Sequence, residues 1–188
     1  GVDYDTMEPE DIVVLDIASG EVQAGEMRPS SDTPTHLELY REFEPVGGVV
    51  HTHSSRATAW AQAGRAIPCM GTTHADHFRG AVPVTRQLSS KEIKEEYEAN
   101  AGRVIVEHFR DNNLRPDHMP AALLPGHGPF TWGEDAQAAF DNAIALEEVA
   151  GTALITLQVE QDAQPLRRQL LDKHFLRKHG EDAYYGQD

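Results

Sequence analysis

Two histidines separated by one residue are the strongest sign of chemistry in this chain. His51 and His53 close an apolar segment that begins at Gly47. In a strand, residues i and i+2 project from the same face, so both imidazoles can be aimed at one ion. A third imidazole, that of His127, lies in a glycine-flanked turn after another short apolar segment. Three such ligands with a position left open are typical of a catalytic zinc-type site.

A carboxylate could complete this site. Asp32 lies in the polar segment 29–36, and carboxylate oxygens bind the same cations as imidazole nitrogens. The alternative is that these residues are unrelated surface or core groups, because a chain with 10 histidines contains some His-x-His pairs by chance. The four positions together favour a divalent-metal site at Asp32, His51, His53 and His127. Zinc, manganese and cobalt all suit such ligands.

The elements that must position these ligands alternate between strands and helices. An apolar run at residues 11–17 predicts a buried strand, and a weaker strand near residues 21–23 would pair with it as a hairpin. A helix is expected to begin at Pro34, and a second helix, which contains Trp60, is expected after the His51–His53 strand. This alternation predicts an α/β fold with a central sheet covered by helices.

The second half of the chain is mostly helical by its pattern. One long helix is expected from Ser89 or Ser90 to about Asn112, with Tyr97 on its buried stripe. Residues 121–124 predict a short strand, and residues 135–157 predict a helix whose far end bends or becomes a strand. A final amphipathic helix is expected at residues 164–179.

Composition limits the class of protein. A chain of 188 residues with 39% hydrophobic content is suited to a single domain with its own core. The net charge of −15 opposes binding to nucleic acid or to an anionic membrane surface. The apolar runs are too short to cross a bilayer and no leader opens the chain, so we expect a soluble, cytoplasmic protein. Cys69 is the sole cysteine and is expected to be a buried structural thiol.

Six ordered sequence blocks, spread over essentially the whole chain, indicate a family. They are Gly1-Val2-Asp3-Tyr4, Pro29-Ser30-Ser31-Asp32-Thr33-Pro34-Thr35-His36, Val50-His51-Thr52-His53-Ser54, Gly71-Thr72-Thr73-His74-Ala75-Asp76, His127-Gly128-Pro129-Phe130, and Leu171-Asp172-Lys173-His174 with Tyr184-Tyr185-Gly186-Gln187. In these blocks the chain closely resembles the L-ribulose-5-phosphate 4-epimerases of the class II aldolase and adducin-head superfamily. Aldolase relatives usually carry Glu where this chain has Asp32.

The resemblance implies a fold, an assembly and roles for particular residues. The fold would be a single class II aldolase-like domain over residues 1–188, with a mainly antiparallel sheet flanked by helices. The protein would be a homotetramer with active sites at subunit boundaries and a zinc-type ion in each site. Asp76 and a neighbour's Tyr185 would be the catalytic acid and base. Gly1, Ser30 and Ser31 match positions that contact the substrate phosphate, and His174 is a weaker candidate.

The implied activity interconverts L-ribulose 5-phosphate and D-xylulose 5-phosphate, usually in arabinose breakdown. Because the inverted carbon, C4, has no acidic hydrogen, the route would be retro-aldol cleavage of the C3–C4 bond and re-addition. The alternatives are a class II sugar-phosphate aldolase that releases its aldehyde, and a metal-free adducin-head-like scaffold. One departure is that the chain begins at Gly1, without the further N-terminal segment of the family and its phosphate-binding lysine and asparagine. We expect that this segment is missing because the sequence is a fragment.

Overall fold

A small antiparallel sheet and one long helix form the centre of the molecule. The computed structural model describes residues 2–44 and 46–185. Their elements, in chain order, are the 3-10 helices η1 (Tyr4–Thr6) and η2 (Pro9–Asp11), then β1 (Val14–Leu15), β2 (Val22–Ala24), α1 (Thr33–Glu42), β3 (Gly48–His51), α2 (Ser55–Gln62), α3 (Thr72–Ala75), α4 (Ser90–Lys94), α5 (Tyr97–Asp111), β4 (Ala121–Leu123), β5 (Pro129–Gly133), α6 (Ala136–Val159) and α7 (Arg168–His179).

The central sheet has the strand order β3-β5-β4, and both pairs are antiparallel. In the β3–β5 pair, Gly48 faces Gly133 and His51 faces Phe130. The end of β3 therefore meets the start of β5. The predicted α/β fold with a mainly antiparallel sheet and flanking helices is confirmed.

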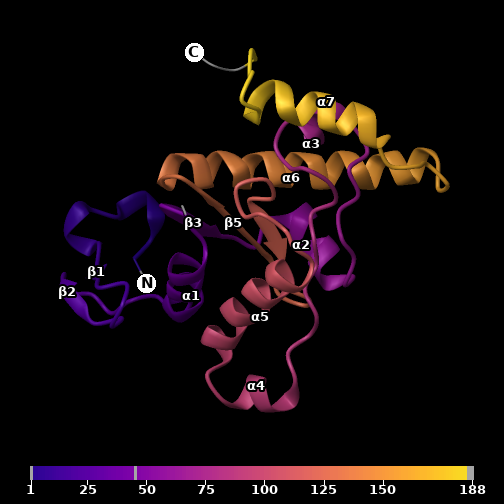
Figure 1. The fold of residues 1–188 in the computed structure, drawn as a ribbon. Helices are drawn as coiled ribbons and strands as arrows, with labels where there is room; N and C mark the ends of the chain where they lie inside the picture. Colours follow the sequence, from indigo (N-terminus) through magenta and orange to yellow (C-terminus); the bar gives the residue numbers. More distant parts are fainter. Residues whose placement is uncertain (1, 45, 186–188) are drawn as a thin grey trace.

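Helices cover this sheet and pack against one another. α6 lies along the sheet and contacts β3, β4 and β5 (Figure 1), and α2 packs against α6, β4 and β5. The side chain of Asp135 begins α6 by accepting a hydrogen bond from the Ala138 amide at 2.7 Å. α1 packs against α5, and α7 packs on α3 on the side of α6 opposite to α5 (Figure 1).

Large aromatic side chains join these layers. The ring of Trp132, on β5, lies 5.1 Å from that of Phe43 and 5.2 Å from that of Phe109 on α5. All three are buried, and Trp132 is 1% exposed. Each buried side chain of this kind contributes about 2–3 kcal/mol through the apolar surface that it removes from water. This cluster fixes α1 and α5 against the sheet that carries the histidines.

Gly48 shows why the strand before the histidines begins with glycine. A Cβ built at Gly48 would lie 2.2 Å from the backbone oxygen of Asp135. No side chain fits in that space, so β3 can pass close to the β5–α6 connection only without one. The apolar strand therefore has a backbone contact at its start and the first histidine at its end.

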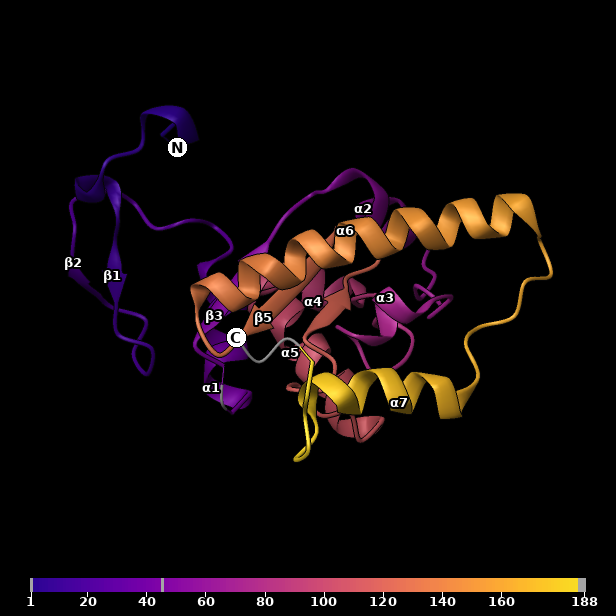
Figure 2. The same cartoon turned by 90° about the horizontal axis from the view of Figure 1, so that it is seen from above.

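The N-terminal hairpin is formed as predicted, but its burial was predicted wrongly. β1 pairs with β2 in antiparallel orientation. The hairpin lies to one side of the sheet in both views (Figures 1 and 2), and Ile12, Val14 and Ile17 are each about half exposed, at 55%, 52% and 48%. The run of apolar residues at 11–17 is therefore an exposed ribbon instead of a core strand.

The long helix expected from Ser89 or Ser90 to Asn112 is divided into α4 and α5. Glu96, between them, has a left-handed backbone with φ of 50°. The predicted start at Ser89 is correct, because its side chain and that of Glu92 form a reciprocal N-terminal cap. Ile93, expected on the buried stripe, is 54% exposed. The break changes the direction of the chain just before Tyr97.

Three further differences concern the second half of the chain. α6 continues as a helix to Val159, so the expected bend or strand is absent from this described segment. α7 begins at Arg168, after the start expected at residue 164. The strand β5, which begins at Pro129, was not predicted. Among the described residues, no helix combines the length and apolar character that a membrane span requires.

Candidate metal centre

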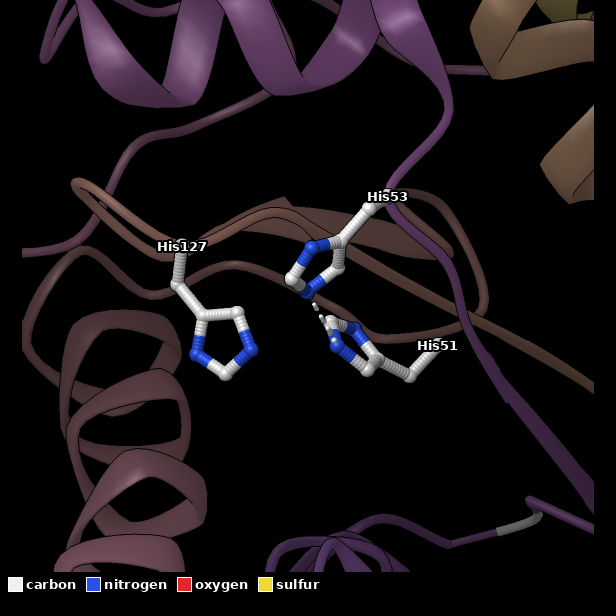
Figure 3. Close-up of side chains that lie close together, drawn as sticks. All are labelled: His51, His53 and His127. Atoms are coloured by element: carbon white, nitrogen blue, oxygen red, sulfur yellow. Dashed lines mark hydrogen bonds between the residues drawn. The ribbon is translucent and has the colours of Figure 1, made fainter. Parts of the chain in front are cut away.

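Three imidazoles meet where β3 ends and β5 begins. His51 is the last residue of β3, His53 follows in the next loop, and His127 lies in the turn between β4 and β5. One ring nitrogen from each lies within 4.8 Å of those of the others. The rings face a common centre (Figure 3), and the Nε2 atoms of His51 and His53 are 3.1 Å apart. The predicted convergence of these histidines is confirmed.

The orientation of His51 is fixed on two sides. Its Nδ1 donates a hydrogen bond to the carbonyl oxygen of Pro129 at 2.9 Å, which leaves the lone pair on Nε2. Its ring stacks on Phe130, with centroids 4.1 Å apart and planes at 16°. A backbone carbonyl and an aromatic ring thus direct Nε2 towards the other histidines.

His127 is held by its neighbours in the turn and by α5. Its Nδ1 lies 3.1 Å from the Tyr97 hydroxyl, and its other ring nitrogen is turned towards His51 and His53 (Figure 3). A Cβ at Gly128 would lie 2.8 Å from the Thr52 carbonyl oxygen and 3.2 Å from the His53 ring. The absence of a side chain at Gly128 therefore gives the three rings room to meet.

Burial makes the imidazoles of His51 and His127 suitable as neutral ligands. Desolvation lowers the pKa of His51, although the Pro129 carbonyl and Asp32 act in the opposite direction. Desolvation also lowers the pKa of His127, and the nearby rings of His51 and His53 lower it further. A metal binds only the neutral form of imidazole. At His51 and His127 the site therefore favours the protonation state that ligation requires.

Asp32 lies beside the three histidines but outside the group whose ligand atoms meet. It immediately precedes α1 and its carboxylate makes no helix-capping hydrogen bond. It lines a cavity of about 390 Å³ together with Ser30, His36 and His51. Apolar side chains of the hairpin, Leu15 among them, form another part of the wall. The cavity gives a ligand access to the His51 side of the cluster.

The remaining predicted residues lie elsewhere. Asp76 follows α3 and accepts hydrogen bonds from Arg177 at 2.9 and 3.2 Å and from His174 Nδ1 at 3.1 Å. Tyr185 is half exposed beyond α7, with its ring 4.2 Å from the Arg177 guanidinium. Asp76, His174 and Tyr185 are therefore gathered around Arg177 within one chain. Ser31 is exposed near the cavity, and Gly1 lies outside the described residues.

Sequence reasoning missed three residues that shape the histidine cluster, namely Tyr97, Gly128 and Phe130. Tyr97 was expected only as part of a buried helix stripe, and its hydroxyl group was the signal that it has a polar partner. The other two stand directly beside His127 and Pro129 in the sequence. Their position next to a predicted ligand was the available signal, but spacing alone does not reveal that Phe130 stacks on His51.

The fold and the histidine cluster define an α/β protein with three imidazoles at one end of an antiparallel sheet. Residues 1–154 match the class II aldolase and adducin N-terminal domain family, and the chain belongs to that family.

Solved structures with the same fold include an L-fuculose 1-phosphate aldolase, which is 24% identical with a TM-score of 0.74 over 93% of this chain and 74% of its own. The L-fuculose-1-phosphate aldolase of Thermus thermophilus is 23% identical, with a TM-score of 0.62 over 87% of this chain and 78% of its own. YgbL from Escherichia coli is 24% identical, with a TM-score of 0.63 over 89% of this chain and 75% of its own. At these identities the similarity shows the fold.

Proposed function

We propose that the protein is a metal-dependent enzyme that interconverts L-ribulose 5-phosphate and D-xylulose 5-phosphate by opening and re-forming a carbon–carbon bond. The observation that carries this proposal is the convergence of His51, His53 and His127 beside a cavity that Asp32 also lines. Membership of the class II aldolase and adducin family supports carbon–carbon bond chemistry on a sugar phosphate. The sequence blocks around Asp76 and Tyr185 support epimerisation as the particular outcome.

The donor set fits a divalent cation. Two nitrogens bound to one tetrahedral zinc ion are about 3.3 Å apart, and the Nε2 atoms of His51 and His53 are separated by 3.1 Å. Three protein ligands with further positions open are typical of a catalytic ion. We propose Asp32 as the fourth ligand, because its carboxylate makes no capping bond and it shares the cavity with His51. Zinc is the proposed ion, and manganese and cobalt suit the same donors.

The chemistry follows from the position of the carbon that is inverted. C4 carries a hydroxyl group and no acidic hydrogen, so its configuration changes when the C3–C4 bond breaks and forms again on the other face of the aldehyde. A bound dication would supply Lewis acidity, which stabilises the negative charge that develops on the ketose oxygens. Ser30 and Ser31, with Gly1, are proposed to hold the phosphate so that the aldehyde fragment stays in place and rotates.

Two groups are proposed to move the proton at the C4 oxygen. They are Asp76 and Tyr185 of a neighbouring subunit, one on each face of the substrate, because cleavage and re-addition present that oxygen in two orientations. His174, which contacts Asp76, is proposed as an auxiliary group. This arrangement requires an oligomer with sites at subunit boundaries, and we propose a homotetramer. It is supported by the exposed position of Tyr185 near the end of the described chain.

The second candidate is an aldolase that releases its aldehyde. It is supported by the same histidine cluster, since the bond cleavage is identical and the two activities differ only in whether both fragments are retained. A metal-free scaffold is the third possibility, and the intact cluster opposes it.

One assay separates these candidates. The metal-loaded full-length protein is incubated with L-ribulose 5-phosphate, and D-xylulose 5-phosphate and free glycolaldehyde phosphate are measured. The epimerase produces the first, whereas an aldolase releases the second. Parallel incubation with L-fuculose 1-phosphate tests for release of lactaldehyde. A purified protein that binds no stoichiometric dication would overturn both enzymatic proposals.

A further inference from the structure

The hydroxyl of Tyr97 makes contact with one of the three clustered histidines from a distant part of the chain. Its oxygen lies 3.1 Å from Nδ1 of His127, and the two rings are nearly parallel, at 10°, with centroids 6.3 Å apart. The other ring nitrogen of His127 is turned towards His51 and His53 (Figure 3). The hydroxyl is therefore on the side of the ring opposite to the ligand atom.

We propose that Tyr97 is a positioning residue that holds His127 in the tautomer and orientation needed for metal binding. This inference rests on the proposed metal-dependent function. An imidazole that ligates through Nε2 carries its proton on Nδ1, and here that N–H donates to the oxygen of the Tyr97 hydroxyl. Ligating histidines usually have such a partner for their second nitrogen. His51 is held in the same way by the Pro129 carbonyl.

The break between α4 and α5 places the Tyr97 side chain beside His127. Tyr97 is the first residue of α5 and follows Glu96, whose left-handed backbone ends the preceding segment. The side-chain amide of Asn100 stabilises the break by donating to the carbonyl oxygens of Glu92, at 3.1 Å, and Glu95, at 2.5 Å. An uninterrupted helix, as the sequence predicts, would have directed this side chain elsewhere.

A contact with α1 fixes the first turn of α5. The hydroxyl of Thr35, which is 1% exposed, donates to the carbonyl oxygen of Glu98 at 2.6 Å. Further along, the two helices touch at Gly102, where a Cβ would lie 2.9 Å from the Thr35 carbonyl oxygen. The backbone next to Tyr97 is thus held by a buried hydrogen bond and close helix packing. A rigid support of this kind is what a residue needs if it is to orient a ligand.

The test is the substitution Tyr97→Phe, which removes only the hydroxyl oxygen. We expect zinc affinity, measured by competition with a chromophoric chelator, to fall by about 10- to 100-fold. The matched control is Tyr184→Phe, which removes the same atom. Tyr184 is 65% exposed and its ring lies against Lys173 instead of a histidine. This control should bind zinc within about twofold of the wild type.

A second measurement tests the same inference without a bound metal. Nitrogen-15 NMR of the metal-free wild type should show His127 with its proton on Nδ1, and in Tyr97→Phe this preference should be lost. A wild-type proton on Nε2, or an unchanged zinc affinity in Tyr97→Phe, would overturn the inference. If the wild type itself binds no stoichiometric zinc, the proposed function fails instead. The two failures are therefore distinguishable.

Discussion

Arg177 holds both carboxylate oxygens of Asp76, with Nη2 2.9 Å from Oδ2 and Nε 3.2 Å from Oδ1. The ring of Tyr185 lies against the same guanidinium, 4.2 Å from its Cζ. A two-point pair of this kind fixes the plane of the carboxylate as well as its position. Within one chain, Asp76 and Tyr185 are thus both in contact with the same arginine of α7, which links the orientation of Asp76 to the end of its own chain. The Tyr185 proposed to act opposite this Asp76 belongs to a neighbouring subunit.

Replacing either proposed proton carrier should reduce epimerisation strongly. We expect Asp76→Asn and Tyr185→Phe each to lower the rate of D-xylulose 5-phosphate formation by about 10²- to 10⁴-fold, because each loses a group that accepts or donates a proton at C4. The zinc content should stay unchanged. Tyr184→Phe is the matched control, since this neighbouring tyrosine is also exposed and its ring lies against Lys173, whereas the Tyr185 ring lies against Arg177. Wild-type rates in both test variants would remove these residues from the mechanism.

A methyl group at Gly128 should displace the histidines. Gly128→Ala places a Cβ 2.8 Å from the Thr52 carbonyl oxygen and 3.2 Å from the His53 ring, so the turn must move. We expect zinc affinity to fall by at least about 10-fold, as when supporting contacts of a ligand are lost. In the control Gly71→Ala, the added Cβ meets no atom within 4 Å among the described residues. Equal zinc affinities for the two variants would contradict this role for Gly128.

Acid should destabilise the protein through His74. This histidine is 3% exposed, its Nε2 donates to the Gly80 carbonyl oxygen, and burial lowers its pKa from 6.5 to about 4. Below pH 6.5 the unfolded chain therefore takes up a proton that the folded protein does not. The contribution of His74 to stability should fall as the pH drops from about 6.5 to about 4 and level off below that, for a total of about 3 kcal/mol.

The measurement compares urea unfolding of the wild type and His74→Phe across this range of pH. Other histidines with pKa values lowered by burial, such as His36 and His77, contribute in the same direction in both proteins. The difference between the two curves therefore isolates His74. We expect the variant to lose less stability than the wild type between pH 6.5 and 4. Parallel curves would show that His74 is not the cause.

The sole cysteine should be unreactive in the folded protein. Cys69 is 3% exposed, and burial raises the pKa of its thiol to about 11. Since the thiolate is the reactive form, alkylation by iodoacetamide at pH 8 should be at least about 100-fold slower in the native state than in urea. Mass spectrometry of the alkylated protein gives both rates. Rapid labelling without unfolding would contradict the buried position.

The histidine cluster was predictable from sequence because its ligands lie at the ends of recognisable strands. His51 and His53 follow an apolar segment with strand spacing, and His127 stands in a glycine-flanked turn. The contact between His127 and Tyr97 was not predictable in this way, since it depends on a left-handed residue, Glu96, that no glycine or proline signals. Local patterns therefore identify the ligands but not the groups that orient them.

Burial and helix length were harder to predict for a related reason. The apolar run at 11–17 has the composition of a core strand, but only the tertiary structure shows that few other residues cover it. The end of α6, where a bend or a strand was expected, contains β-branched residues, which have low helix propensity. In the structure, Thr152 and Thr156 bond back to carbonyl oxygens four residues earlier, and the helix continues.

Because His51 faces Phe130 across the β3–β5 pair, strand alignment and not a loop determines where this imidazole lies. Inserting or deleting one residue in β3 would turn His51 to the opposite side of the sheet. A change of length in residues 160–167, between α6 and α7, leaves that alignment intact. Chimaeras made from this protein can thus exchange the α6–α7 connection, but they must inherit β3 and β5 from the same parent.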